Sequence, residues 1–583
     1  MDQPLIRESD TVAATLLVFE PRRFLSVSLA FVRSHAAEFT SGALLALMGL
    51  QMFTVIWRKS ITVDELVMIP SAYYHLVDGD FQLVNEHPPL SKLVAATPLL
   101  FVQPNEQPEH GAFWDYNEKK YPSIAFWSRA GMIVLTLTIG VLIFIFTRTL
   151  FGPRAAVIAV ALFSLEPTML AHGRVVQTDV PAAFGYLLFF MALYWYAGAI
   201  TCRRAVFLGV AAAVALLSKY SMLLIGLVLP PVFIILWWRY AHARGSRRRA
   251  VVLHAAVVLL VMILTVNAAY FFQHASLNET DHVWIAAKFT GHPETVDQVS
   301  ELLSHIVPKE FVLGVLFQLV HNREGHSASL LGMHSQMGWW YYFPVAFALK
   351  TTLPFLLVSL VALGWASFRL VKQRDLRFVW LVAPVLIYSV FVLFSHINIG
   401  VRYLAPIFPF LMIAGAALLD HLLRLRRTIA TVFVAVLLAW TGIEAVRAFP
   451  NHISYMNQLA SRHPHWWYLS DSNVEWGDDV RGLALYLKQH GERRVADATL
   501  GGFGILRFYG IERVDPLAKK IDDAESPKYL AIGASLLNGS TVPGGPPGSG
   551  RDTTEARVNY FAAYRQQTPE AVIGDSIYVF RLR

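Results

Sequence analysis

The sequence predicts an α-helical protein that crosses a membrane about eleven times and ends in a small water-soluble α/β domain. Two observations support this fold class. Hydrophobic residues make up 55% of the 583 residues and charged residues only 15%, whereas a soluble domain carries about 25% charged residues. The apolar residues also gather in long runs that end near residue 448, after which polar and apolar residues mix. A chain of this composition cannot cover a water-facing surface of its own size.

Eleven apolar runs are predicted membrane spans, because each approaches the roughly 20 residues that a helix needs to cross the hydrocarbon core. The earlier run Leu16–Arg33 is interrupted by Pro21, Arg22 and Arg23, and we interpret it as an amphipathic segment at the membrane surface. The predicted spans are Ser41–Trp57, Ala130–Thr147, Ala155–Leu170, Val180–Ala199, Ala205–Leu217, Ser221–Trp238, Ala250–Phe272, Tyr342–Phe368, Phe378–Phe394, Val401–Leu419 and Thr428–Val446.

Basic residues between the spans predict the orientation, because inner loops of membrane proteins are enriched in Lys and Arg. The net charge of +8 therefore indicates membrane orientation and not a nucleic-acid partner. With the N-terminus inside, an odd number of spans leaves the tail outside. We expect a multi-pass protein of a bacterial inner (cytoplasmic) membrane with its tail in the periplasm. The predicted inner connectors carry Arg148 and Arg154, Arg203 and Arg204, Arg244 and Arg247–Arg249, Arg369 to Arg377, and Arg424 to Arg427.

These boundaries divide the chain into three predicted parts. Residues 1–40 form a cytoplasmic N-terminus, 41–448 the multi-span domain with long outer loops at 58–129 and 273–341, and 449–583 a periplasmic domain. Within the tail we predict a helix that begins after Asp471–Asn473 and ends at His490, and strands at Tyr529–Ile532 and Ile577–Phe580. An acidic cluster in the tail is interpreted mainly as helix capping and dipole complementarity: Asp471, Asn473, Glu475, Asp478 and Asp479.

The first outer loop begins with two adjacent carboxylates, Asp64 and Glu65, directly after the first span. Carboxylates at the mouth of a membrane helix are costly to desolvate, which favours a proton acceptor or a ligand. An ordinary solvated loop start explains the pair equally well. The loop continues to the motif His87-Pro88-Pro89-Leu90 and then Lys92.

Three further motifs follow in the membrane region. After the third span come Glu166-Pro167 and the run Gln177-Thr178-Asp179-Val180-Pro181, and later the aromatic run Gly338-Trp339-Trp340-Tyr341-Tyr342-Phe343-Pro344 precedes Lys350. The last motif is Asn398-Ile399-Gly400-Val401-Arg402-Tyr403-Leu404. Together with the first loop, they resemble the protein O-mannosyltransferase family and the similar bacterial lipid A aminoarabinose transferases, of the polyprenyl-phosphate-sugar-dependent GT-C superfamily.

The resemblance implies a GT-C glycosyltransferase that moves one sugar, a hexose or pentose, from a polyprenyl-phosphate donor to an acceptor at the outer membrane face. It implies inversion at the anomeric carbon. The acceptor is left open between a protein, a lipid and a glycan, and membrane lipids surround the chain. We expect no required cofactor. A divalent metal is the less favoured alternative, because no nucleotide diphosphate needs neutralising and the scattered histidines lack a metal-binding spacing.

By this resemblance Asp64 is the predicted general base, since a hydroxyl becomes a nucleophile when a carboxylate takes its proton. Glu65 is expected to position the sugar or the acceptor. Cations are expected to stabilise the leaving phosphate; the candidates are Arg402, Lys219 and Lys350. Each has a structural alternative: membrane anchoring for Arg402 beside Tyr403, a turn between spans for Lys219, and pairing with a buried acid for Lys350. The remaining predicted substrate-binding residues are His87, Lys92, Glu166, Asp179 (or a cap of the fourth span) and Tyr403.

Two other functional classes remain open. A secondary transporter or flippase for a lipid-linked or anionic substrate would place polar residues near the membrane midplane and often shows inverted repeats. Here most acids cluster at outer helix ends, which favours chemistry at a surface. A non-catalytic assembly subunit is disfavoured because Asp64, Asp179 and Arg402 are all present.

Overall fold

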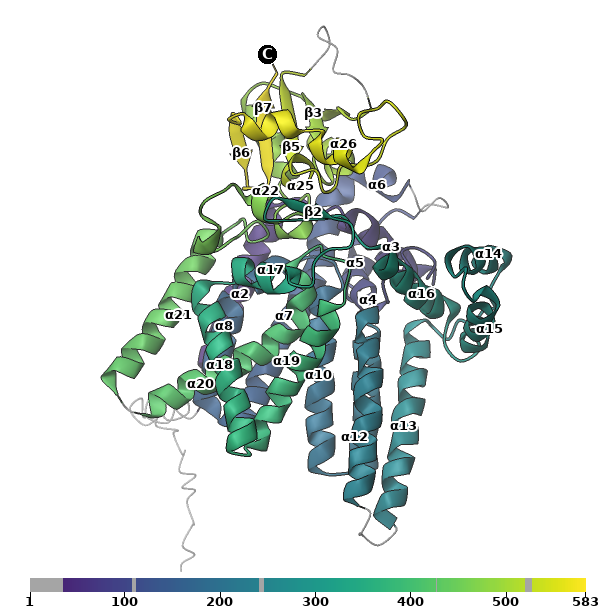
Figure 1. The fold of residues 1–583 in the computed structure, drawn as a ribbon, viewed down its shortest axis with the longest axis vertical. Coiled ribbons are helices and arrows are strands. Elements are labelled where there is room, and N and C mark those ends of the chain that lie inside the picture. The colour runs from purple at the N-terminus through teal and green to yellow at the C-terminus, as the bar shows by residue number, and fades with distance from the viewer. Residues whose placement is uncertain (1–34, 107–111, 241–245, 426, 519–526, 583) are drawn as a thin grey trace, which may run out of the picture.

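The computed structural model describes residues 35–582 apart from 107–111, 241–245, 426 and 519–526, so the predicted segment Leu16–Arg33 lies outside the described residues. It is a bundle of long helices with a small sheet domain at one end (Figure 1). Within this part of the chain nine helices are long and apolar enough to cross a membrane. They contain α2 (Ala36–Arg58), α7 (Tyr121–Phe151), α10 (Asp179–Gly198), α12 (Ile225–Arg239), α13 (Ser246–Ala269), α18 (Leu353–Lys372), α19 (Val379–Leu393), α20 (Phe408–Arg424) and α21 (Thr428–Ala448).

All eleven predicted apolar runs are helical, and the predicted class of polytopic helical protein with a small tail domain is confirmed. Two runs form shorter helices, α8 (Pro153–Leu165) and α11 (Cys202–Leu216). Two of the predicted runs are wrong in one respect, because each breaks: Ala155–Leu170 is interrupted at Glu166 between α8 and α9 (Pro167–His172), and Tyr342–Phe368 breaks into α17 (Tyr342–Lys350) and α18. The second break follows from Thr352, whose side chain caps α18 by accepting a hydrogen bond from Phe355 N–H.

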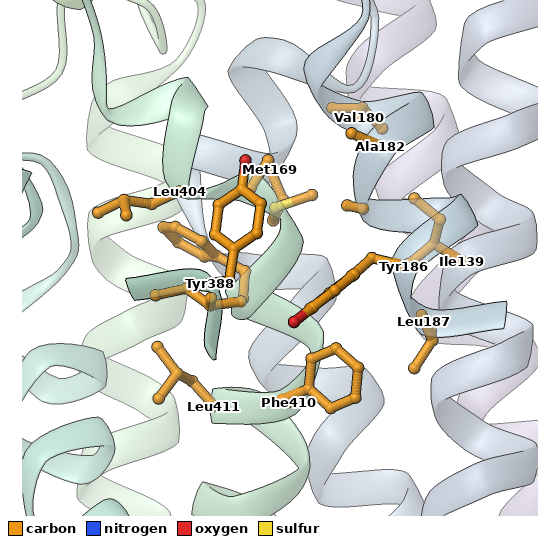
Figure 2. Close-up of a cluster of buried hydrophobic side chains, with 14 of the residues drawn as sticks. Ile139, Met169, Val180, Ala182, Tyr186, Leu187, Tyr388, Leu404, Phe410 and Leu411 are labelled. Atoms are coloured by element: carbon orange, nitrogen blue, oxygen red, sulfur yellow. The ribbon is translucent and has the colours of Figure 1, made fainter. Parts of the chain in front are cut away.

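Helix α10 lies in the middle of the bundle, where aromatic side chains meet (Figure 2). The ring of Tyr186 contacts those of Tyr388 and Phe410, with centroids 5.5 and 5.7 Å apart, and its hydroxyl donates to the carbonyl of Pro384 at 3.0 Å. On the other side, a Cβ at Gly185 would lie 2.6 Å from the Cα of Ala215, so glycine lets α11 approach closely. Lipid tails are as apolar as these side chains, so close packing and hydrogen bonds hold the helices together.

The two long loops, 58–129 and 273–341, fold into short elements at the end of the bundle that carries the sheet domain (Figure 1). The first loop contains α3 (Glu65–Val77), α4 (Leu90–Ala96), α5 (Leu99–Val102) and α6 (Phe113–Tyr116), and α9 (Pro167–His172) lies between α8 and α10. The second contains α14 (Glu279–Lys288), α15 (Pro293–Ser304), α16 (Lys309–Glu324) and the hairpin of β1 (Ala328–Leu330) and β2 (Met333–Ser335).

The tail forms a five-stranded sheet in the order β4-β3-β5-β7-β6. Strands β4, β3 and β5 are parallel, whereas β7 runs antiparallel to both β5 and β6. The two predicted strands are confirmed as β5 and β7. The elements are α22 (His465–Tyr468), α23 (Val480–Gln489), β3 (Arg494–Ala498), α24 (Gly502–Ile505), β4 (Glu512–Val514), β5 (Tyr529–Gly533), α25 (Ala534–Leu537), α26 (Thr554–Asn559), β6 (Ala571–Ile573) and β7 (Ile577–Arg581).

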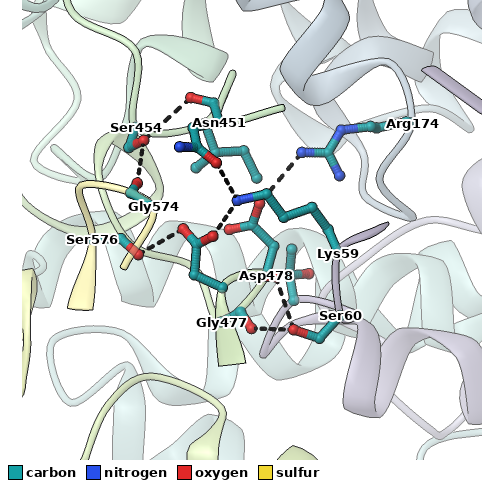
Figure 3. Close-up of polar contacts among 12 residues, drawn as sticks. Lys59, Ser60, Arg174, Asn451, Ser454, Gly477, Asp478, Gly574 and Ser576 are labelled. Carbon is teal, nitrogen blue, oxygen red and sulfur yellow. Dashed lines mark hydrogen bonds and ion pairs between the residues drawn. The ribbon is translucent and has the colours of Figure 1, made fainter. Parts of the chain in front are cut away.

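Buried ionic contacts join the tail domain to the membrane helices (Figure 3). Lys59, at the end of α2, forms an ion pair with Asp479 and donates to the side-chain oxygen of Asn451 at 2.6 Å. Arg174 pairs with Asp478 at 3.3 Å, and both side chains are buried. Removing one partner of a buried ion pair leaves an uncompensated charge. The tail domain is therefore fixed to the helices by mutually dependent contacts.

The opposite end of the bundle carries the basic connectors. Arg154 at the start of α8 and Arg424 at the end of α20 both bind the carboxylate of Asp420. Arg377, before α19, donates to the carbonyl of Leu150 in α7 at 3.2 Å. The connectors between α7 and α8, α18 and α19, and α20 and α21 therefore meet at the end remote from the sheet domain (Figure 1).

Candidate active site

A polar cavity of about 280 Å³ lies between the tail domain and the helix ends that face it. Six of the ten predicted site residues line this cavity: Asp64, His87, Asp179, Lys219, Arg402 and Tyr403. They come from segments up to 339 residues apart in the sequence, as the numbers of Asp64 and Tyr403 show. Further lining residues are Glu86, Gln177, Tyr220, Phe317, Gln318, His321, His326, Asp471, Trp476 and Leu500.

Asp64 precedes the first residue of α3 and makes no side-chain capping bond to that helix. Its carboxylate lies 3.4 Å from the guanidinium of Arg402, and 35% of its side chain is exposed. Burial within the protein raises the pKa of Asp64, an effect that the positive charge of Arg402 opposes and the negative charge of Asp471 reinforces. A carboxylate with a raised pKa is a stronger base than an ordinary aspartate, which suits it to accept a proton.

Asp179, the first residue of α10, binds two cations. One oxygen forms an ion pair with Lys219, and the other lies 3.4 Å from Arg402. The structure has Thr178, and not Asp179, at the cap position of α10. Lys219 also lies 3.6 Å above the ring of Tyr403, a cation–π contact. The two cations and two carboxylates form one connected ionic cluster.

Arg402 is the centre of this cluster and keeps donor capacity for another ligand. One terminal nitrogen serves both Asp64 and Asp179, while its buried Nε has no hydrogen-bond partner among the described residues. A guanidinium presents five N–H donors in a planar fork that matches the oxygens of a phosphate. The arrangement can therefore hold an anionic group on the cavity side.

Histidines cover another part of the cavity wall. Burial, together with the neighbouring charges of Lys92 and Lys219, lowers the pKa of His87 to about 3, so its imidazole is neutral. His321 and His326 meet at 3.2 Å between ring nitrogens. Among the described residues there is no group of three or more side chains arranged to hold a metal ion.

Glu65 does not line the cavity. Its two oxygens accept hydrogen bonds from Arg129, of which one is 2.8 Å long, and both side chains are fully buried. The same carboxylate accepts from the backbone N–H groups of Thr62, at 2.7 Å, and Val176, at 2.9 Å. Glu65 therefore connects α3 to α7 and to the segment before α10, next to Asp64 but facing away from the site.

Three other predicted site residues also lie outside the cavity lining and contact the protein itself. Lys92 donates to the carbonyls of Leu83 and Val84, at 3.0 and 2.7 Å, and so supports the loop before His87. The other two residues, Glu166 and Lys350, contact segments that are far away in the sequence. The Glu166 carboxylate accepts from Thr352 at the break between α17 and α18.

Lys350 ends α17 and points into the tail domain. Its ammonium donates to three backbone carbonyls, those of Ile453, Tyr455 and Asn473, at 2.6, 2.5 and 2.5 Å. An ammonium has three donors, so this set leaves none for a phosphate. The buried-acid alternative is also not what the structure shows, because the partners are carbonyl oxygens.

The tail residues of the cavity were not among the predicted site residues. The acidic cluster does not cap a helix: α23 begins only at Val480, and Asp479 makes no side-chain capping bond to it. Glu475 instead accepts from the backbone of Leu500 and Ser535, at 2.6 and 2.9 Å. The available signal was the composition of this segment, a tryptophan among five acidic or amide side chains, which is unusual for a solvated helix start.

A second, apolar cavity of about 320 Å³ adjoins the polar one. The two share Lys219, Tyr220, Gln318 and Tyr403 as wall residues. Leu223, Leu319 and Phe394 in the wall are substantially exposed on the bundle surface. The other residues of the apolar wall are Ser221, Val315, Asn322, Tyr388, Phe391, Val392, Ser395 and Ile397. A ligand with an anionic head and an apolar tail fits this pair of cavities.

The solved structures that are similar to this chain are distant from it in sequence. A comparison with curated proteins found no significant match. Among solved structures, ArnT from Cupriavidus metallidurans bound to undecaprenyl phosphate is 14% identical, over 92% of this chain and 97% of that chain, with a TM-score of 0.46. The oligosaccharyltransferase AglB from Archaeoglobus fulgidus, in complex with an inhibitory peptide and a dolichol-phosphate, is 12% identical over 78% of this chain, with a TM-score of 0.45. The match spans 58% of the length of AglB.

The family comparison covers the part of the chain that holds most of the site. Residues 43–278 match the family of dolichyl-phosphate-mannose-protein mannosyltransferases. This region includes Asp64, His87, Asp179 and Lys219, whereas Arg402 and the tail lie beyond it. The resemblance predicted from the motifs is confirmed there: from residue 43 to residue 278, this multi-pass membrane protein is similar in sequence to the dolichyl-phosphate-mannose-protein mannosyltransferases.

Proposed function

We propose that the protein is an inverting glycosyltransferase that uses a polyprenyl-phosphate sugar as its donor. The observation that carries this proposal is the shared wall of the two cavities. Lys219 and Tyr403 border both the polar cavity, which holds Asp64 and Arg402, and the apolar cavity, whose wall reaches the bundle surface. A lipid-linked sugar needs this combination: apolar surface for its chain, cations for its phosphate and a carboxylate for its sugar end.

The chemistry follows from the positions of these groups. The carboxylate of Asp64 accepts the proton of an acceptor hydroxyl while that oxygen forms a bond to the anomeric carbon. The bond between this carbon and the phosphate oxygen breaks at the same time, and its electron pair leaves with the polyprenyl phosphate. Arg402 and Lys219 stabilise the developing charge on the phosphate. Attack opposite the leaving group inverts the anomeric carbon.

The cluster in the free protein fits this role. Arg402 contacts both Asp64 and Asp179, so a phosphate at Arg402 would replace one set of anionic oxygens by another. Asp179 retains Lys219 as a partner during that exchange. Holding Asp64 within reach of a cation also favours its ionised, base-competent form.

The outer membrane face is the proposed location of the site. The basic connectors gather at the end of the bundle remote from the tail domain (Figure 1), and basic connectors favour the inner side. We accordingly propose a bacterial inner membrane with the cavity and the tail in the periplasm. The acceptor, by the same proposal, is a protein, a lipid or a glycan that reaches the cavity from that side.

A transfer assay tests the proposal against the transporter alternative. Purified protein in proteoliposomes is given a panel of undecaprenyl-phosphate monosaccharides together with an envelope extract as acceptor, and undecaprenyl phosphate release is measured by mass spectrometry. We expect release with at least one donor and none from the Asp64→Asn variant. Movement of intact donor between leaflets without release, equal in both proteins, would support a flippase.

A further inference from the structure

The tail domain supplies one wall of the polar cavity through the segment Asp471–Asp479, which we call the wall segment. Trp476, within it, is 1% exposed. Its ring lies under the guanidinium of Arg402, 4.1 Å from ring centroid to the central carbon, and its side chain interacts with the Asp64 carboxylate and lowers the pKa of that carboxyl. One tail side chain thus contacts both the proposed base and the proposed phosphate-binding cation.

The backbone of the wall segment is attached on both sides of the cavity. The carbonyl of Trp476 accepts from Val63 N–H at 2.8 Å, one residue before Asp64. The side chain of Asn473 accepts from Val401 N–H at 2.9 Å, one residue before Arg402. The wall segment therefore spans the distance between two loops that are far apart in sequence.

The placement of Trp476 is fixed by its surroundings. Gly477 has a φ of +96°, and a Cβ there would lie 2.9 Å from the carbonyl of Leu500, so the turn after Trp476 requires glycine. The indole packs against Ala171, Val175 and Ile453. Such rigid placement is what a side chain needs in order to orient its neighbours.

We propose that Trp476 is a positioning residue of the active site, which holds Asp64 and Arg402 in their working geometry through its N–H and its ring face. The inference rests on the proposed function, which assigns Asp64 as the base and Arg402 as the phosphate-binding cation. The tail domain is then part of the active site and not an appended module. No chemical step is assigned to Trp476, because its indole neither gains nor loses a proton at neutral pH.

The two contacts of Trp476 predict separate effects. Loss of the indole N–H removes the interaction with Trp476 that lowers the pKa of Asp64, and so raises the pKa of that carboxyl. The other charged groups that face Asp64 stay in place: Arg402, Asp471 and Asp179 nearby, and Glu86, His87, Lys219, His321 and His326 in the remaining wall. Loss of the ring face affects Arg402 and hence the donor.

Three substitutions separate these effects. Trp476→Phe keeps a ring under Arg402 and removes the N–H; Trp476→Tyr keeps a ring and offers a hydroxyl donor; Trp476→Leu removes both. The matched control is Trp467→Phe, the same exchange in the same domain, at a tryptophan that stacks on His463 outside the cavity lining.

The first measurement needs no donor. Dicyclohexylcarbodiimide modifies protonated carboxyl groups, so the pH dependence of its attachment to Asp64, followed by peptide mass spectrometry, reports the ionisation of that residue in the full-length protein. We expect the Phe variant to move the labelling midpoint upward by about one pH unit, and the Tyr variant to restore part of the shift. The inference would be overturned if the labelling midpoints of the Phe and Tyr variants equalled those of wild type and of Trp467→Phe.

The second measurement uses transfer from the undecaprenyl-phosphate donor that wild type accepts. In the Phe variant we expect the acid limb of kcat/KM to move to higher pH together with the labelling midpoint. In the Leu variant we expect a donor KM at least severalfold higher than in the Phe variant. A purely structural tryptophan would lower yield and kcat without moving the acid limb. Wild-type protein that transfers from no donor would overturn the proposed function instead, while the labelling result would still decide whether Trp476 positions Asp64.

Discussion

Glu65 and Arg129 form a fully buried, doubly hydrogen-bonded ion pair that joins the start of α3 to α7. This pair explains why two adjacent carboxylates have different surroundings. Asp64 faces the cavity, whereas Glu65 faces the buried cation of Arg129. Substitutions of the two residues should therefore have different consequences, although each removes one negative charge from the same loop.

Asp64→Asn should abolish transfer and leave the protein folded. Asparagine has nearly the same volume but cannot accept the acceptor's proton at neutral pH. General base catalysis commonly contributes about 10²–10⁴-fold, so we expect a loss in that range in single-turnover transfer from purified donor. Wild-type turnover in this variant would remove Asp64 from the role of base.

Glu65→Gln should mainly lower the stability of the folded protein. It leaves Arg129 buried without a full charge partner, and breaking a buried ion pair costs about 3–5 kcal/mol. We expect a lower midpoint of thermal unfolding in detergent and a reduced yield of monodisperse protein, with a milder loss of transfer per folded molecule than in Asp64→Asn. A stable but fully inactive Glu65→Gln protein would instead assign the base to Glu65.

Arg402→Ala should weaken the use of the lipid donor more than the use of the acceptor. Hydrogen bonds to charged groups contribute about 1.5–3 kcal/mol each, so loss of one corresponds to at least about a tenfold fall in donor kcat/KM. Binding of undecaprenyl phosphate to the purified protein gives the same comparison without chemistry. Unchanged donor kinetics and binding would assign Arg402 to a structural role with Asp64 and Asp179.

The acid limb of the rate profile should lie above the ordinary aspartate value of 3.8, because burial raises the pKa of Asp64. A base works only when ionised, so kcat/KM should fall as the pH drops through this raised pKa. Asp471→Asn removes a negative charge that raises the same pKa, so its acid limb should move to lower pH. A shift to higher pH would contradict the electrostatic relationship between Asp471 and Asp64.

A reporter fused after Arg583 should test the orientation. If the tail is periplasmic, an enzyme active only in the periplasm will be active at this position, and a cytoplasm-only reporter will not. The reverse result would move the cavity to the inner face, together with Asp64, because the wall segment ties the tail to the loop before α3.

The sequence indicated best those candidate site residues that belong to a recognisable motif. Asp64, Asp179 and Arg402 were each marked by a motif, and the structure brings them together in one cavity. Lys350 lies outside the cavity lining, and its three partners are backbone carbonyls of the tail. Carbonyl groups occur at every residue, so no sequence pattern distinguishes those that will meet a lysine.

Trp476 could not have been assigned from the sequence for a related reason. Its contacts depend on the docking of the tail, which rests on pairs such as Lys59 and Asp479, 420 residues apart in the chain. Hydrophobic periodicity gives spans and strands because it is local. Pairing between isolated buried charges has no period, so only the folded chain reveals it.

The wall segment also limits how this protein can be recombined with its relatives. A chimera joined at residue 449, the boundary suggested by composition, would exchange Trp476 and Asp471 along with the sheet and so take these two residues of the cavity wall from a different parent than the ionic cluster. A crossover placed after Asp479 keeps every lining residue of the polar cavity except Leu500 with the helices of the same parent. Donor and acceptor preferences in such hybrids should then follow the parent that contributed residues up to 479, whichever sheet follows.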